Sequence, residues 1–313
     1  MTMPPIAVAA PAPPELRADA PLAPLTTIRV GGPADWAASV TSFRAAVAAL
    51  AWARDAGARV AVVGKGSNLL VADEGFRGLV LRLVGRLQAI SIRGDEVWCG
   101  GGASLPRAVQ RAGAAGLEGL EFGASIPGTA GGAVAMNAGA YRVDLAVVLR
   151  WAVLCSAEGR RRVGPQDLDL GYRRSAVRAD EVVGAVCFSL RPGDPEAIAA
   201  RLAELRGHRR STQPQGVRTF GSVFTNPPGD SAGRLLEAAG GKGLAVGGAR
   251  FSPVHANFIE ASPGCRAADV LALMAEGRRR VRAAGGPVLE PEVRYLDPLR
   301  GIGRPPLPPL EPR

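Results

Sequence analysis

The chain has 313 residues, 47% of them hydrophobic, which is enough for two or three domains with a sizeable core. No apolar run approaches the roughly 18 to 20 residues that span a bilayer, which argues against an integral membrane protein. The net charge is +10, but the basic residues form no dense block and aromatic residues make up only 5%, so we expect no nucleic-acid partner.

Proline is concentrated at the two ends of the chain. Thirteen of the 26 prolines fall in residues 1–24 and 298–313. Because proline interrupts both helices and strand ladders, we expect residues 1–23 and 297–313 to be disordered tails.

Helical and extended patterns alternate between these ends. The first half predicts a helix over residues 41–56, capped by Thr41 or Ser42, and strands at 59–63 and 78–84. A further helix is expected to begin at Ser104. The remaining predicted elements are an antiparallel pair at 87–93 and 96–100, strands at 150–155, 182–190 and 257–260, and helices at 231–239 and 266–284.

These elements indicate an α+β chain with two glycine-rich lobes and a C-terminal lobe. The pattern changes near residue 206. We expect the lobes to cover residues 24–84, 85–205 and 206–296.

A glycine-rich turn, Gly-Lys-Gly-Ser-Asn, follows the strand at 59–63 directly. Glycines here let the backbone approach a ligand and turn several N–H groups toward a phosphate. The turn is not a P-loop, because Gly66 stands where Ser or Thr must follow the lysine. It is not a dinucleotide fingerprint either, because Leu69 replaces the third glycine. A tight surface turn is the alternative reading.

A second glycine-rich stretch covers residues 123–141. It joins an Ile-Pro-Gly turn to Thr129, a candidate helix N-cap, and continues in small residues. Such a helix can bring its N-terminal amides onto a pyrophosphate. Close helix packing is the alternative, but it does not account for the polar residues Ser125, Thr129 and Asn137.

Three later stretches carry reactive side chains, at residues 171–175, 221–227 and 289–294. Each taken alone also fits an ordinary loop. The chain has only two histidines and no Gly-x-Ser-x-Gly motif, which argues against a Ser-His-Asp hydrolase. Its four cysteines are far apart, so we expect no metal site and reduced thiols. The N-terminus does not resemble a secretion signal, and we expect a cytoplasmic protein.

The order of these stretches resembles the UDP-N-acetylenolpyruvoylglucosamine reductase family, in its shorter subclass without an inserted tyrosine-bearing loop. Any one motif is weak, but seven in family order are very specific. The matching segments are 27–34, 64–71, 121–133, 172–175, 221–224, 255–259 and 290–294.

The resemblance implies a two-lobed FAD-binding fold of the vanillyl-alcohol-oxidase type with a C-terminal substrate-binding lobe. It also implies non-covalent FAD, NADPH as co-substrate, and UDP-N-acetylglucosamine enolpyruvate as substrate. In such an enzyme Ser222 donates the proton, Arg173 stabilises the enolate-like charge, and Glu292 orients or polarises the same end of the substrate. Glu292, rather than Glu290, matches the family position before Val-Arg.

The resemblance also suggests ligand contacts. The expected substrate contacts are Tyr172, Asn226 and His255. The expected FAD contacts are Arg29, Gly31, Gly64, Lys65, Gly66, Ser67, Asn68, Leu69, Gly123, Ser125, Ile126, Gly128, Thr129, Gly132 and Asn137.

The chain departs from the commonest family pattern at Thr225, where Lys or Arg is usual. A nearby arginine, Arg209 or Arg210, is the candidate replacement for that cation. Two other classes stay open from the residues: a flavin oxidase that tethers FAD covalently, and a non-enzymatic nucleotide- or RNA-binding protein. A covalent tether to FAD needs His or Cys, and neither glycine-rich stretch of this chain contains one. A binding protein would leave Ser222, Arg173 and Glu292 unexplained.

Overall fold

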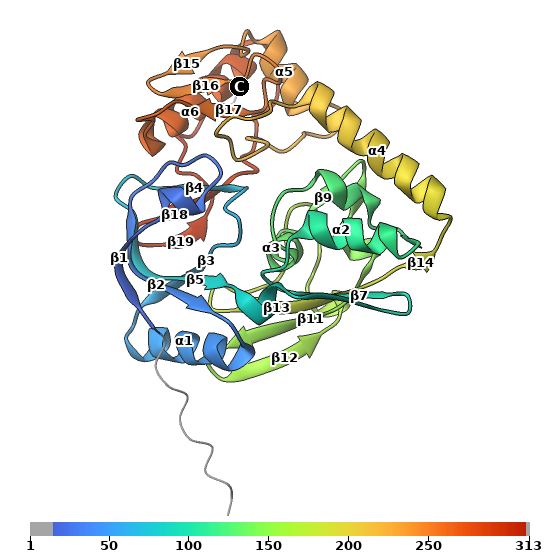
Figure 1. Ribbon diagram of the computed structural model, residues 1–313. Coiled ribbons are helices and arrows are strands. Elements are labelled where there is room, and N and C mark those ends of the chain that lie inside the picture. The colour runs from blue at the N-terminus through green and yellow to red at the C-terminus, as the bar shows by residue number, and fades with distance from the viewer. Residues whose placement is uncertain (1–14, 311–313) are drawn as a thin grey trace, which may run out of the picture.

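The computed structural model describes residues 15–310, which form three lobes (Figure 1). In Figure 1 the first lobe is blue, the second is mostly green, and the third, orange to red, lies at the top. Helices and strands are mixed throughout, as the α+β pattern predicts. Within the described residues, no helix combines the length and the apolar character that crossing a membrane requires.

The first lobe rests on a four-stranded sheet in the order β1-β2-β5-β3, packed against helix α1. Its elements are β1 (Arg17–Pro21), β2 (Pro33–Val40), α1 (Phe43–Asp55), β3 (Arg59–Val62) and β5 (Phe76–Leu83). Ser42 begins α1 as predicted, because its Oγ accepts a hydrogen bond from Ala45 N (3.2 Å). β2 is not among the predicted strands.

Both ends of the described chain are built into this lobe. β1 pairs antiparallel with β2. At the other end, β18 (Arg294–Asp297) pairs in parallel with β4 (Leu69–Val71) and antiparallel with β19 (Gly301–Gly303). The prediction of disordered tails is therefore wrong for these strands; residues 1–14 and 311–313 lie outside the described part.

The error has a physical reason. β1 is an edge strand, and proline is tolerated there because its missing N–H takes no ladder bond away. β19 contains no proline, and Pro298 and Pro305 lie on either side of it. Pro21 is the last residue of β1 and faces Pro33, the first residue of β2. Proline density therefore marked strand ends at both termini rather than the absence of strands.

The second lobe contains a five-stranded sheet in the order β12-β11-β13-β7-β6. The predicted pair of strands before residue 100 is present, with a turn at Gly94 and Asp95, although β6 is shorter than predicted. The elements of the lobe are β6 (Ile90–Arg93), β7 (Glu96–Gly100), α2 (Leu105–Ala114), β8 (Leu117–Glu118), α3 (Ala130–Ala135), β9 (Gly139–Ala140), β10 (Val143–Asp144), β11 (Leu149–Ser156), β12 (Gly159–Val163), β13 (Val182–Ser189) and β14 (Arg191–Pro192).

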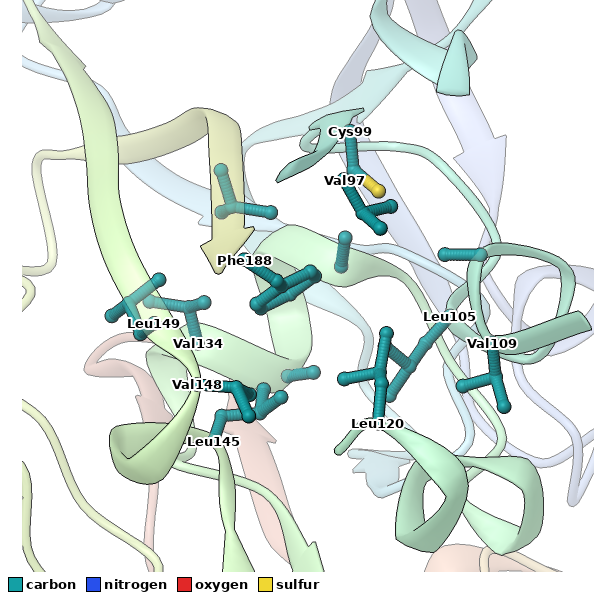
Figure 2. Packing of buried hydrophobic residues seen from close by; sticks show 14 of the residues in the cluster. Val97, Cys99, Leu105, Val109, Leu120, Val134, Leu145, Val148, Leu149 and Phe188 are labelled. Carbon is teal, nitrogen blue, oxygen red and sulfur yellow. The ribbon is translucent and has the colours of Figure 1, made fainter. Parts of the chain in front are cut away.

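One face of this sheet packs against the helices of the lobe. Figure 2 shows Phe188 of β13 in the middle of this core, with Val97 above it and Leu120 and Leu105 to one side. These side chains are all buried. Burial of large apolar side chains on one sheet face fixes the register of β7 and β13, because a one-residue slip would turn them to the other face.

The third lobe follows helix α4 (Pro195–Thr212), which crosses from the green lobe to the orange one in Figure 1. The sequence did not predict α4, and a boundary at residue 205 would cut through it. The other elements of the lobe are α5 (Ala232–Ala238), β15 (Ala245–Val246), β16 (Ala249–Phe251), β17 (Ile259–Ala261) and α6 (Ala267–Ala283). Its core also takes in Ile28, Val30 and Leu70 of the first lobe.

Candidate active site

A pocket lies between the first two lobes, where the two glycine-rich stretches meet. The first lobe contributes Gly64 and Lys65, and the second contributes residues that are mostly small. The pocket-lining residues of the second lobe include Gly101, Gly102, Thr129, Gly131, Gly132, Ala135 and Val183. Ser67 Oγ donates to Pro127 O (2.9 Å), which ties the two stretches together.

The turn at residues 64–68 presents its backbone amides without internal partners. None of the described residues accepts a hydrogen bond from these amides. Consecutive unpartnered N–H groups in a turn form a concave site for an anion. Lys65 adds a positive charge, and its Nζ donates to Ser104 Oγ (2.9 Å). This turn fits the diphosphate of FAD.

The N-terminus of α3 is arranged differently from the prediction. Thr129 does cap the helix, since its Oγ1 accepts from Gly132 N (3.3 Å). However, Ala130 N donates to Ala103 O and Gly131 N to Gly101 O, both at 2.8 Å. The amides at the start of α3 therefore already have acceptors, and a contact from residues 125–132 to the pyrophosphate stays a prediction that other groups of this stretch would have to satisfy. The alternative interpretation, that small residues allow close packing, accounts for the start of this helix.

The glycines of the pocket serve two different purposes. A Cβ on Gly66, which has φ +59°, would lie 2.3 Å from Leu25 O, and one on Gly131 would lie 2.7 Å from Val183 O. These two glycines therefore allow the protein to pack against itself. Gly132 is exposed, and only Thr129 Oγ1 would lie within 4 Å of its Cβ, at 3.2 Å. Gly132 thus leaves open space at the pocket.

Several residues that were expected to contact FAD are buried in the protein or bond its backbone. Leu69 is buried in the first-lobe core, and Gly123 is buried against Val109. Asn68 Nδ2 donates to Glu292 O (3.3 Å), so it reaches the segment that carries Glu292. Asn137 is 1% exposed, and both ends of its amide bond the backbone.

The remaining expected contacts lie at the edges of the site. Gly128 lies beside Ser67, with φ +138°. Ser125 Oγ is 3.1 Å from Tyr141 Oη, and Ile126 packs against the second-lobe core. Arg29 is exposed, with φ +59°, and Gly31 lies against Val71.

Arg173 and Glu292 form an ion pair although 119 residues separate them in sequence. Arg173 Nε donates to Glu292 Oε1 (2.7 Å), and Arg173 Nη2 donates to Gly139 O (2.9 Å). Both side chains are largely buried, at 21% and 16% exposure. Burial raises the pKa of Glu292, and the guanidinium acts against that shift.

Ser222 lies next to this pair through the backbone. Val223 O accepts from Glu292 N (2.8 Å), and Phe224 forms an isolated bridge with Pro291. The Ser222 hydroxyl has no hydrogen-bond partner among residues 15–310. The three side chains expected to carry the reaction thus come from one cluster of loops. Glu290 instead pairs with Arg304 at the surface (2.8 Å), which supports the choice of Glu292.

The residues expected to contact the substrate differ in exposure and in their hydrogen bonds to the rest of the protein. Tyr172 is 57% exposed, and the Arg173 guanidinium lies 4.8 Å from its ring centre. Asn226 Oδ1 accepts from Ala232 N at the start of α5 (3.0 Å). His255 Nδ1 accepts from Asn257 N (3.2 Å), and burial lowers the pKa of His255.

Thr225, where the family usually has Lys or Arg, lies outside the helices and strands and bonds the backbone of residue 290. Thr225 N and Oγ1 both donate to Glu290 O. Arg209 of α4 donates from Nη1 to Ser125 O, at the edge of the second glycine-rich stretch, and burial lowers its pKa. Arg210 is exposed.

Sequence reasoning missed Gly101 and Gly102 as pocket-lining residues. Their signal was present, because three consecutive glycines, residues 100–102, stand at the end of the strand predicted at 96–100. A Cβ on Gly101 would lie 1.8 Å from Val183 O, and one on Gly102 would lie 2.3 Å from Leu83 O. These positions demand glycine because three segments of backbone meet there.

Comparison with known proteins agrees with this pocket. Residues 35–163 match the model of an FAD binding domain. The fold and the site therefore define an FAD-binding oxidoreductase with a two-lobed FAD-binding fold.

The third lobe identifies the family. Residues 213–296 match the C-terminal domain of UDP-N-acetylenolpyruvoylglucosamine reductase. The reductase of that name from Anaeromyxobacter dehalogenans is 47% identical over 278 residues, covering 89% of this chain and 84% of the relative. The one from Rubrobacter xylanophilus is 42% identical, covering 90% and 96%. The crystal structure of the enzyme from Thermus caldophilus is 38% identical with a TM-score of 0.77, covering 90% and 98%. The chain belongs to the UDP-N-acetylenolpyruvoylglucosamine reductase family.

Proposed function

We propose that this protein uses NADPH to reduce UDP-N-acetylglucosamine enolpyruvate to UDP-N-acetylmuramate in the cytoplasm. The observation that carries the proposal is the buried ion pair of Arg173 and Glu292. The backbone joins Glu292 to the residue after Ser222, and Asn68 joins it to the turn that fits FAD. FAD held at the turn of residues 64–68 would supply the hydride chemistry between NADPH and the terminal alkene carbon of the substrate.

Arg173 has the geometry for stabilising the charge that then develops on the substrate. Its Nε and Nη2 are held by Glu292 and Gly139. Its Nη1 has no partner among the described residues, so two N–H groups can face the substrate carboxylate. Negative charge that flows toward this carboxylate in the enolate-like species is then met by a fixed cation.

Ser222 supplies the proton that completes the reaction. Its free hydroxyl can donate to the carbon next to the carboxylate, a centre basic enough for an alcohol to act as the acid in a dry site. Glu292 holds the plane of the Arg173 guanidinium and keeps its charge compensated while the substrate is absent.

Two half-reactions measured separately test the proposal. NADPH should bleach the flavin of the purified protein without oxygen, and the enolpyruvyl nucleotide should restore its absorbance. Failure of the nucleotide to reoxidise the flavin would refute the substrate assignment. Flavin that stays with acid-precipitated protein would point instead to a tethered oxidase.

A further inference from the structure

The loop that carries Arg173 is tied to one short segment by three regularly spaced hydrogen bonds. Ser175 Oγ donates to Ala135 O (2.7 Å), and Arg173 Nη2 donates to Gly139 O (2.9 Å). Between them, Asn137 Nδ2 donates to Gly171 O (3.0 Å). The segment 135–139 therefore holds the arginine loop at every second residue.

The Arg173 backbone needs such support. Its φ is +57°, in the left-handed region that residues other than glycine rarely adopt. Gly171 and Arg174 exchange two backbone hydrogen bonds, both 3.1 Å, which close a tight turn around Tyr172 and Arg173. A turn with a strained residue at its tip persists only where its surroundings determine it.

Asn137 is the anchor of that turn. It is 1% exposed and also has a left-handed backbone, with φ +39°, which asparagine tolerates. Its Oδ1 accepts from Ala146 N (3.1 Å), so the amide is held at one end while the other end holds Gly171. Because Asn137 is buried and both polar atoms of its side chain already bond the backbone, the side chain is not presented to a ligand.

We propose that Asn137 is a positioning residue for the reaction, which sets the orientation of Arg173 toward the substrate carboxylate by fixing the turn at Gly171. This inference rests on the proposed function and deepens it. It also replaces the expectation that Asn137 contacts FAD. Because Asn137 acts only through Arg173, its loss should affect the step in which Arg173 meets developing charge.

The variant Asn137→Asp tests this with little change in volume. The carboxylate keeps an acceptor for Ala146 N and tolerates the left-handed backbone, but it cannot donate to Gly171 O. We expect normal flavin content and normal reduction by NADPH. Reoxidation by the enolpyruvyl nucleotide should slow by about 10- to 100-fold, the scale on which a small misplacement of a catalytic group acts.

Ser42→Ala is the matched control. It removes the cap of α1 in the first lobe and costs stability without touching the arginine loop. Both of its half-reactions should keep their rates. If Asn137→Asp lowers the affinity for FAD or slows both half-reactions equally, the positioning role is refuted.

A double-mutant cycle shows whether Asn137 acts through Arg173. In an Arg173→Lys background, Asn137→Asp should slow reoxidation further by less than about threefold, since the fork that it orients is already absent. Additive losses would overturn the inference. Wild-type protein that is not reoxidised by the nucleotide would instead overturn the proposed function, so the two failures can be told apart.

Discussion

Ser222 is the residue to which we assign the proton transfer of the proposed reaction. It has no base beside it, and its hydroxyl has no partner within residues 15–310. Such a group is useless as a nucleophile in water but sufficient as a proton donor to a strongly basic carbon. Its position follows from the backbone bond between Glu292 N and Val223 O.

Ser222→Ala should therefore separate the two half-reactions. Flavin reduction by NADPH should keep a near-normal rate, while reoxidation by the enolpyruvyl nucleotide should fall by about 10² to 10⁴. Ser222→Cys should recover part of the loss, because a thiol still carries a proton. Stopped-flow absorbance of the flavin measures both steps, and equal slowing of the two would show that Ser222 is not the donor.

Glycine substitutions distinguish space kept for a ligand from space kept for packing. Gly132→Val should weaken FAD binding at least about tenfold, or ~1.4 kcal/mol, with little loss of stability, because its side chain would enter the pocket. Gly66→Val should lower the melting temperature instead, because its Cβ meets the backbone of Leu25 and Thr26. Flavin fluorescence titration and thermal unfolding measure the two effects. Full FAD affinity in Gly132→Val would place the cofactor elsewhere.

Among the elements, the C-terminal segment differs most from its prediction, which was a disordered tail over residues 297–313. β19 adds a strand beside β18, and Leu307 packs against the third-lobe core. Arg278, which is 8% exposed, donates to Pro308 O (3.0 Å) and to Leu289 O (3.0 Å). The segment thus ties the third lobe to the first, and it satisfies a buried charge.

Truncation after Pro298 should lower the free energy of unfolding by about 1 to 3 kcal/mol, because buried Arg278 loses its acceptor, Pro308 O. Truncation after residue 310 keeps all of these contacts and serves as the control. The midpoint of urea unfolding measures the loss. Equal midpoints for the two truncated chains would show that β19 and the contact to Pro308 carry no stability.

At the scale of the whole molecule, the three lobes bury all four thiols to different degrees. Cys99, Cys155 and Cys187 are buried, and Cys265 is half-buried; none is in a disulfide. Burial raises the pKa of Cys99 to about 12 and that of Cys155, Cys187 and Cys265 to about 11. A thiol reacts as the thiolate, so at pH 8 only about one molecule in 10³ to 10⁴ is reactive at each site.

Native protein should accordingly react slowly with a disulfide reagent at pH 8, and unfolded protein should react at all four cysteines at once. Cys265 should react first, because it is the most exposed of the four. Release of the coloured thiolate from the reagent measures both rates. A native thiol that reacts as fast as free cysteine would contradict the packing of its lobe.

The sequence alone determined the parts of this protein that depend on local chemistry. Caps such as Ser42 and Thr129, the turn at residues 64–68 and the order of the motifs depend on neighbouring residues, and each could be identified before the fold was known. The family resemblance named Arg173 and Glu292, and the structure brings these two side chains together.

Only the tertiary structure decided which polar groups were left for a ligand. In the sequence, the amides at the start of α3 and the side chain of Asn137 look available. In the folded chain, those amides donate to carbonyl groups of another segment. The Asn137 side chain donates to Gly171 O and accepts from Ala146 N. The strand made by residues 17–21 likewise exists because β2 lies beside it. A hydrogen bond has one donor and one acceptor, and whether a distant partner has taken a group is a property of the folded chain rather than of local sequence.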